Sequence, residues 1–147
     1  MFYGEYRHAL DEKNRLFIPA KLRQPPGEER PINGFFITTG MEKTLFLFTA
    51  KGFEELRQSF SKLPFTNLRQ REFQRTFYAN TSFSELDPQG RVLIPDALKG
   101  WAVLRRDVAI LGVENRIELW DSSRWEKYRK QSSRRFERTA DGLFKIS

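Results

Sequence analysis

The amino-acid sequence predicts a mainly β protein with helices, an α+β fold in which two tandem units share one core. One short segment occurs twice, as HALDEKNRLFIP at residues 8–19 and as SELDPQGRVLIP at residues 84–95. Apolar and polar residues alternate around these copies with the period of two that half-buried strands show. Further matches follow in the same order beyond both copies, which indicates a duplicated unit.

The two copies align with one change of spacing. Five residues recur 76 positions later: Asp11, Arg15, Ile18, Pro19 and Leu22 become Asp87, Arg91, Ile94, Pro95 and Leu98. The later matches, from Gly40 with Gly112 to Leu56 with Tyr128, have an offset of 72. The four-residue difference falls in RQPPGEERPING at residues 23–34, whose Pro and Gly content predicts an exposed loop.

Each unit begins with a strand, a polar turn and a second, short strand. In the first unit Tyr6, His8 and Leu10 alternate with other residue types, and the turn DEKNR leads into the apolar run LFI. In the second unit the turn DPQGR leads into VLI. Gly90 suits a turn position of positive φ, and Asn14, at the matching position, is the next most tolerant residue. The prolines that follow both runs predict the start of a short helical turn.

A hairpin and a helix complete each unit. FFITT and LFLF form a hairpin around GMEK, and VAIL and RIELW form its counterpart around GVEN. Phe53, Leu56, Phe60 and Leu63 fall three or four residues apart, which predicts one apolar helix face. In the second unit Asp121 to Ser123 offer helix caps, with Ser123 and Glu126 at capping-box spacing. Between the units, Asn67 to Tyr78 is predicted as a further helix with Phe73 and Phe77 facing inward.

Two strand pairs of this size bury little alone, so the units are expected to share their core. Trp101, Trp120 and Trp125 lie in apolar patterns and are predicted to be core residues. The remaining apolar edges favour self-association, a hypothesis that rests on six aromatic residues: Phe2, Tyr3, Phe35, Phe36, Phe46 and Phe48.

Charge is the most informative property of the composition. The 147 residues carry 26 Lys and Arg against 19 Asp and Glu, a net charge of +7, which favours a polyanionic partner such as nucleic acid. Seven of the basic residues lie between Arg124 and Arg138 beside only two glutamates. No apolar run reaches the roughly 20 residues of a membrane-spanning helix, the N-terminus lacks a signal-peptide pattern, and there is no Cys. A cytoplasmic protein without membrane contact is expected.

Two DxxxR turns, each followed by an apolar strand and Pro, with GVENRIELWDSSRWEKY behind the second, resemble the MraZ family. The resemblance covers residues 1–128. It implies a cytoplasmic, nucleoid-associated transcription factor with two tandem AbrB-like (swapped-hairpin) units. It also implies a homo-oligomeric ring that binds direct repeats of double-stranded DNA in its own promoter, ahead of division and cell-wall genes. Asn14 departs from the family's usual Gly, and Lys99 from its usual Arg.

The expected organisation has four parts. The first AbrB-like unit spans residues 5–51 and a helical connector spans residues 52–80. The second AbrB-like unit spans residues 81–124, and a C-terminal basic helix and tail span residues 125–147.

The DxxxR turns are the candidate site, and two interpretations apply to them. Asp11 and Asp87 can brace their turns, because a carboxylate accepts backbone N–H groups and holds a guanidinium. The duplication favours DNA contact by the same turns, with both Asp residues as supports, since Arg and Gln pair with bases and Lys with phosphate. The predicted DNA contacts, strongest at the more basic first turn, are Lys13, Asn14, Arg15, Lys21, Arg7 and Arg23, followed by Arg91 and Gln89.

Other functions are weighed against DNA binding. An enzyme is not expected: there is no Cys, His8 is the only His, and no glycine-rich phosphate loop is present, so neither a metal nor a cofactor is predicted. An antitoxin-type AbrB-like module that binds a protein, or an RNA-binding protein, remains the alternative. In that case the basic stretch from Arg124 to Arg138 is the surface that a partner would use.

Overall fold

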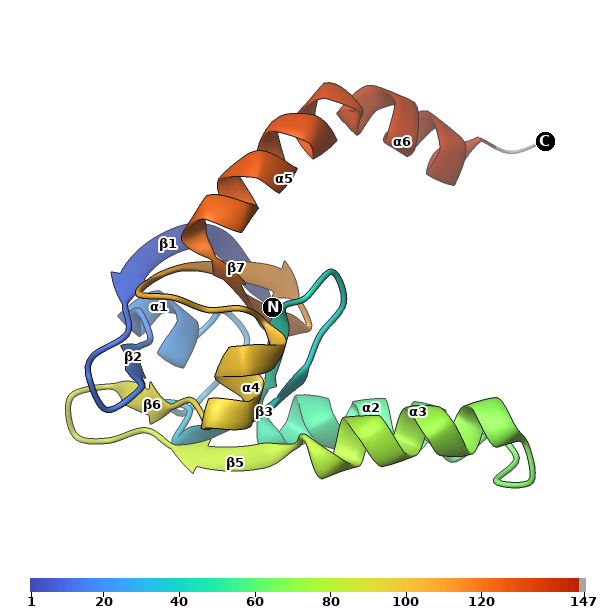
Figure 1. The fold of residues 1–147 in the computed structure, drawn as a ribbon, viewed down its shortest axis with the longest axis horizontal. Helices are drawn as coiled ribbons and strands as arrows, with labels where there is room; N and C mark the ends of the chain where they lie inside the picture. Colours follow the sequence, from blue (N-terminus) through green and yellow to red (C-terminus); the bar gives the residue numbers. More distant parts are fainter. Residues whose placement is uncertain (146–147) are drawn as a thin grey trace.

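A computed structural model describes residues 1–145, and it has the expected α+β architecture (Figure 1). The strands are β1 (Phe2–Ala9), β2 (Arg15–Phe17), β3 (Gly34–Thr39), β4 (Leu45–Phe48), β5 (Ser82–Glu85), β6 (Arg91–Leu93), β7 (Asp107–Glu114) and β8 (Arg116–Asp121). The helices are α1 (Ala20–Arg23), α2 (Ala50–Phe60), α3 (Leu68–Ala79), α4 (Asp96–Trp101), α5 (Ser122–Arg134) and α6 (Phe136–Phe144). None of these helices is long and apolar enough to cross a membrane.

Six strands form an antiparallel sheet in the order β1-β7-β8-β4-β3-β5, and β2 pairs with β6 in a separate two-stranded sheet. Both predicted hairpins are confirmed, as β3 with β4 and β7 with β8. The hairpins join through β4 and β8, where Leu45 faces Leu119 and Leu47 faces Ile117. The four residues are buried, so this junction closes the middle of the sheet over the core.

The two units exchange their first strands. β1 of the first unit pairs with β7 of the second, and β5 of the second unit pairs with β3 of the first. The short strands β2 and β6 also pair across the units, with Leu16 opposite Val92. The pairing is extended by two matching bonds, from Ile18 N–H to the Gly90 carbonyl and from Ile94 N–H to the Asn14 carbonyl. The arrangement therefore has an internal, approximately two-fold relation between the copies.

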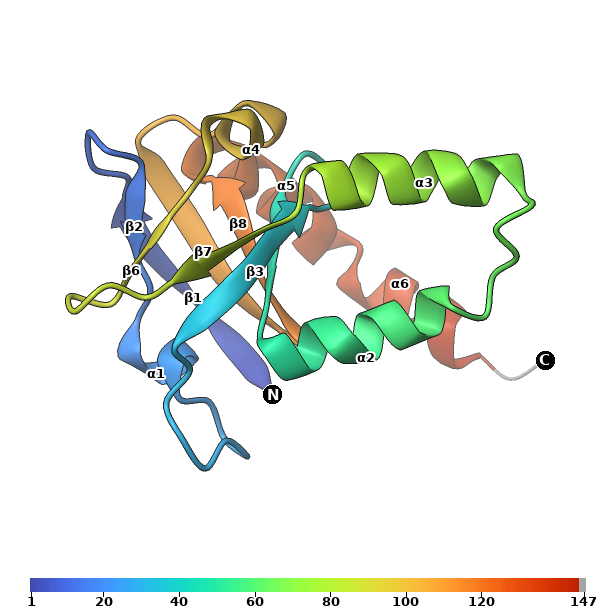
Figure 2. The same ribbon diagram turned by 90° about the horizontal axis from the view of Figure 1, so that it is seen from below.

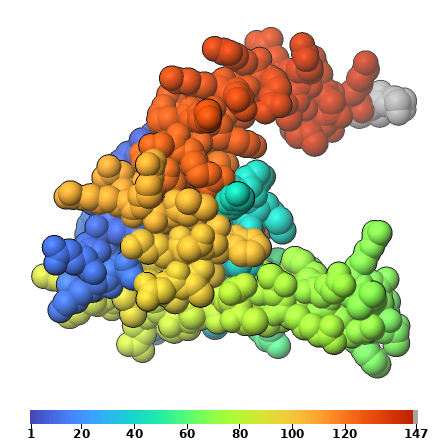
Figure 3. All heavy atoms as spheres, viewed as in Figure 1, coloured from blue at the N-terminus to red at the C-terminus, as the bar shows by residue number. Residues whose placement is uncertain are grey.

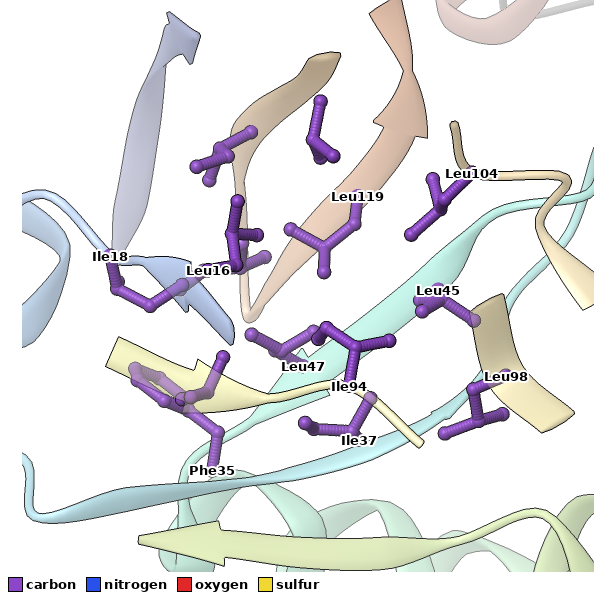
Figure 4. Close-up of a cluster of buried hydrophobic side chains, with 14 of the residues drawn as sticks. Leu16, Ile18, Phe35, Ile37, Leu45, Leu47, Ile94, Leu98, Leu104 and Leu119 are labelled. Carbon is purple, nitrogen blue, oxygen red and sulfur yellow. The ribbon is translucent and has the colours of Figure 1, made fainter. Parts of the chain in front are cut away.

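The expected shared core is confirmed. Leu16, Ile18 and Ile94 are fully buried, and they pack with side chains from the hairpins of both units (Figure 4). Leu22 of α1 and Leu98 of α4 occupy matching positions and enter the same cluster. Of the 18 buried residues in this cluster, nine come from each copy, so neither copy buries its own strands without the other.

The predicted connector is a helical hairpin that projects from the sheet (Figure 2). The side chains of Thr49 and Asn67 cap α2 and α3 by accepting a backbone N–H in the first turn. Phe53 and Phe77 are buried, as the apolar spacing predicted, and they stack with 6.1 Å between their ring centroids. Phe73, which was also predicted to face inward, is 37% exposed, although its ring packs against that of Phe60. Helix α2 ends at Phe60. Leu63, the last residue of the predicted apolar face, therefore lies beyond the helix and is 51% exposed.

The C-terminal arm begins at Asp121, the first of the residues predicted as helix caps. The Asp121 carboxylate accepts the N–H of Arg124, whereas Ser123 lies inside the first turn, so the predicted capping box is wrong. The chain enters α5 directly from β8, and this places Asp121 at the junction. Beyond α5, α6 extends away from the sheet, and Figure 3 shows the hollow between this arm and the α2–α3 hairpin. The last two residues of the predicted tail lie outside the described residues.

The three tryptophans have different environments. Trp120 is buried and packs against the half-buried Trp125, with 5.3 Å between their ring centroids. Trp101 is 42% exposed, so its predicted core position is wrong. It ends α4, where Ala102 and Leu104 already fill the neighbouring part of the core.

The aromatic residues that suggested self-association serve mostly the chain's own packing. Phe2, Phe35 and Phe48 are buried, whereas Tyr3 is 59% exposed. Self-association therefore stays a prediction. Among residues 1–145, the four most exposed of the large apolar side chains lie on the two projecting arms: Phe65, Phe136, Leu143 and Phe144.

The contact between β2 and β6 gives a stability prediction. Leu16→Ala leaves a cavity between the two units and is expected to lower the free energy of unfolding by about 2–5 kcal/mol. Leu93→Ala is the matched control, because Leu93 is 54% exposed on the partner strand and its truncation is expected to cost about 0.5 kcal/mol or less. Denaturant unfolding measures both values. Equal losses for the two variants would contradict the central position of this pairing.

Candidate nucleic-acid interface

The two DxxxR turns lie at the same end of the molecule, remote from the helical arms (Figure 1). The first turn connects β1 to β2, and the second connects β5 to β6. The pairing of β2 with β6 places their bases together, and Nη1 of Arg91 lies 3.4 Å from Oδ2 of Asp11 in the other turn. The duplicated motif is therefore brought together in space as one surface.

Asp11 braces the first turn by three hydrogen bonds. Its Oδ1 accepts the backbone N–H groups of Lys13 at 2.8 Å and of Arg15 at 2.9 Å. Its Oδ2 accepts Nε–H of Arg15 at 2.8 Å. The backbone closes the same turn, because Asn14 N–H donates to the Asp11 carbonyl at 3.0 Å. One carboxylate therefore fixes both the loop and the guanidinium that the loop carries.

The second turn repeats this geometry. Oδ1 of Asp87 accepts the N–H groups of Gln89 and Arg91, each at 2.9 Å, and Oδ2 accepts Nε–H of Arg91 at 2.8 Å. The position before each Arg has positive φ, +59° at Asn14 and +79° at Gly90, as expected from their residue types. In each turn the Asp carboxylate makes the hydrogen bonds that the predicted bracing role requires.

These bonds favour the ionised form of both carboxyl groups. The N–H of Arg15, together with its guanidinium and the N–H of Lys13, holds the pKa of Asp11 below its ordinary value of 3.8. The corresponding donors of Arg91 and Gln89 lower the pKa of Asp87 in the same way. Near neutral pH each turn therefore presents a guanidinium that is oriented by a charged partner.

The tips of the turns offer further polar groups. Lys13 and Gln89 occupy matching positions and are exposed, whereas Arg15 and Arg91 are half-buried behind them. Across residues 1–145, the Nη atoms of Arg15 form no hydrogen bond to protein, so they are available to a ligand. Lys21 is exposed on α1.

Two cations from the short helices approach the turn of the opposite unit. Arg23 donates from Nε to the Ile18 carbonyl at 2.8 Å, and its guanidinium covers Gly90 of the second turn. Its counterpart Lys99 donates to Oδ1 of Asn14 in the first turn at 3.1 Å. Arg23 was grouped with the first turn from the sequence, but it lies against the second.

Arg7 does not join the turns. Its guanidinium donates to the Glu126 carboxylate, to the Ser122 hydroxyl at 2.6 Å and to Glu5 at 3.3 Å. The guanidinium of Arg129, followed by that of Arg7, lowers the pKa of Glu126. Arg7 thus ties β1 to α5 and is engaged away from the surface that the turns form.

Sequence reasoning missed a basic pair beside the first turn. Arg105 and Arg106 line an open depression of about 600 Å³ together with Asp11, Glu12 and Lys99. Arg105 bonds the buried Asp121 carboxylate at 3.3 Å, whereas Arg106 is exposed and its carbonyl accepts the N–H of Leu10. The sequence shows this pair only as two adjacent arginines at residues 105–106. Neither of them belongs to the matches between the two copies, so the repeat did not point to them.

Comparisons with known proteins agree with the repeat. A family model described as "MraZ protein, putative antitoxin-like" matches twice, over residues 1–76 and 77–145. Three similar relatives carry the name transcriptional regulator MraZ. They come from Finegoldia magna (42% identity, 97% of this chain and 96% of the relative), Moorella thermoacetica (40%, 97% and 96%) and Acetivibrio thermocellus (43%, 87% and 86%).

The depressed carboxyl pKa values predict a specific acid sensitivity. Because Asp11 and Asp87 have a lower pKa in the folded state, their bonds stabilise the fold above the unfolded-state value near 3.8. That contribution is lost as the pH falls below about 3.8 through the folded-state pKa. We expect the free energy of unfolding to fall less steeply over this window in Asp87→Asn than in the wild type.

Denaturant unfolding across this pH window measures the difference. Asp141→Asn, which neutralises an exposed carboxylate on α6, is the control and should follow the wild type. If Asp87→Asn and the wild type lose stability in parallel, the carboxylate does not brace the fold.

Proposed function

The chain belongs to the MraZ family, and from this premise we propose that it is a transcriptional regulator that binds double-stranded DNA through its two DxxxR turns. The observation that carries the proposal is the pair of identically braced turns at one end of the molecule. Each holds a guanidinium at 2.8 Å from its own Asp and exposes a polar residue at the tip.

The chemistry of the turns fits a DNA surface. Arg15 and Arg91 can donate in parallel to the O6 and N7 atoms of guanine, Gln89 can pair with adenine, and Lys13 suits phosphate. The Asp carboxylate of each turn repels phosphate, but it also fixes the Arg guanidinium before DNA arrives. Less side-chain entropy is therefore lost on binding. Asp11 and Asp87 are therefore positioning residues rather than DNA contacts.

Repeated promoter boxes are the proposed target. The family resemblance points to direct repeats upstream of the protein's own gene, ahead of division and cell-wall genes, and to a ring of several chains. A single pair of turns offers few base contacts, whereas a ring that engages several boxes gains affinity through effective concentration. The proposed location, in the cytoplasm on the nucleoid, follows from this target.

A protein partner is the second candidate. The matched family is described as antitoxin-like, and α6 exposes Phe136 at 71% and Phe144 at 80% of their surfaces. An exposed apolar helix face of this kind suits a protein contact better than a DNA contact.

Fluorescence anisotropy tests the role of the turns. Duplex DNA from upstream of the gene is compared with a shuffled duplex, for the wild type and for Arg15→Ala and Arg91→Ala. Each substitution is expected to weaken promoter binding by roughly tenfold or more and to reduce the preference over shuffled DNA. Circular dichroism checks that each variant keeps its fold.

Arg75→Ala is the matched control, because it removes the same charge from the exposed face of α3, remote from the turns. It is expected to change the affinities for both duplexes by the same small factor. Equal binding of promoter and shuffled DNA, unchanged by Arg15→Ala, would exclude the turns as the reading surface and direct attention to the protein partner.

Light scattering tests the ring. The chain has a mass of 17.4 kDa, and the expected particle is a multiple of it at micromolar concentration. A monomer at that concentration would contradict the avidity argument, although it would leave DNA contact by single turns possible.

A further inference from the structure

We infer that the two turns are unequal DNA-binding surfaces, and that Arg23 is a DNA contact of the second turn, supplied by the opposite unit. This inference rests on the proposed function and adds to it a division of labour between the turns. It comes from three pairs of positions that match in the repeat but differ in residue type: Ala20 and Asp96, Arg23 and Lys99, and Asn14 and Gly90.

The second turn is completed by a guanidinium from α1. Arg23 is fixed at two points, by its Nε bond to the Ile18 carbonyl and by its position 5.3 Å from the centroid of the Phe17 ring. A Cβ atom placed on Gly90 would lie only 2.9 Å from Cζ of Arg23. The guanidinium therefore lies directly on the turn that carries Arg91, and its Nη atoms form no hydrogen bond within residues 1–145.

At the equivalent place beside the first turn, three polar side chains are joined by hydrogen bonds to one another. Nζ of Lys99 donates to Oδ1 of Asn14 at 3.1 Å, and Nδ2 of Asn14 donates to Oδ1 of Asp96 at 2.7 Å. The cation is thus bonded to the turn itself, and a carboxylate stands at the end of the chain. At the second turn the position of Asp96 is occupied by Ala20, which carries no charge.

The difference in charge decides which turn attracts phosphate through this position. Lys99 and Asp96 together contribute no net charge beside the first turn, whereas Arg23 alone contributes a full positive charge beside the second. Arg also presents a planar fork to a phosphate, whereas Lys presents a single ammonium. We expect Arg23 to add a phosphate contact next to Arg91, and Lys99 to add none next to Arg15.

The same packing makes residues 14 and 99 interdependent. An arginine at position 99, placed as Arg23 is, would occupy the space of the Asn14 side chain, because the corresponding space on Gly90 is filled by Arg23. Asn14 and Lys99 therefore act as a matched pair. Changing both to the residues of the other copy, as Asn14→Gly with Lys99→Arg, rebuilds the guanidinium-covered geometry at the first turn.

A matched pair of substitutions tests the inference. Arg23→Gln and Lys99→Gln each neutralise one cation at equivalent places. Anisotropy against promoter DNA over a salt series is expected to show roughly tenfold weaker binding for Arg23→Gln. The slope of the logarithm of the binding constant against the logarithm of the salt concentration is expected to become shallower by about one. Lys99→Gln is expected to stay within about twofold of the wild type. Equal effects of the two variants would overturn the inference.

The triple variant Asn14→Gly/Asp96→Ala/Lys99→Arg, which gives the first turn all three residues of the other copy, is an independent test that does not weaken the Arg23 contacts. It is expected to bind promoter DNA more tightly than the wild type and to steepen the salt slope by about one. An unchanged affinity and slope, with a native circular dichroism spectrum, would overturn the inference even if Arg23→Gln fails to fold.

The outcomes separate this inference from the proposed function. If the wild type prefers its promoter and Arg15→Ala abolishes the preference, the proposed function holds whether or not Arg23→Gln and Lys99→Gln differ. If the wild type binds promoter and shuffled DNA alike, the proposed function fails. A difference between Arg23→Gln and Lys99→Gln on shuffled DNA would then report general phosphate contact alone.

Discussion

The pairing of β2 with β6 is the constraint on which the other features depend. Three residues from each unit form it, and the flanking bonds from Ile18 to Gly90 and from Ile94 to Asn14 extend it into both turns. Since each bond ends on the residue of positive φ in the opposite turn, the backbone of one turn is held by the chain of the other. Burial of Leu16 and Val92 beneath the pairing makes its separation costly, so the two turns keep one relative position.

Each turn combines two demands that oppose one another. A rigid guanidinium needs a charged partner, and Asp11 and Asp87 supply it, but a carboxylate also lowers the attraction of the surface for a polyanion. The structure separates the two demands in space, because the carboxylates accept Nε and backbone N–H groups behind the tip while Lys13 and Gln89 stand in front. Rigidity is thus achieved on the protein side of the turn, and the polar atoms that face outward remain uncommitted.

Local features could be predicted from the sequence, and long-range partners could not. The hairpins, the helical connector and the positive φ at Asn14 and Gly90 follow from residue types within a few positions, and the repeat then indicated the shared core. The contacts of Arg7 with Glu126 and of Lys99 with Asn14 join residues 119 and 85 positions apart, which no spacing rule reaches. Trp101 was misplaced for a related reason: its exposure depends on other residues that fill the core.

Strand exchange within a single polypeptide has a further consequence. Two identical chains that exchanged strands in this way would carry every substitution twice, and their paired turns would stay the same. Here the copies are covalently joined, so Asn14 and Gly90 can differ while the framework keeps its two-fold relation. A surface built from two identical turns looks the same from either direction along a duplex. A surface with two different turns has a polarity, and under the proposed function such a surface suits repeated boxes that all run in one direction.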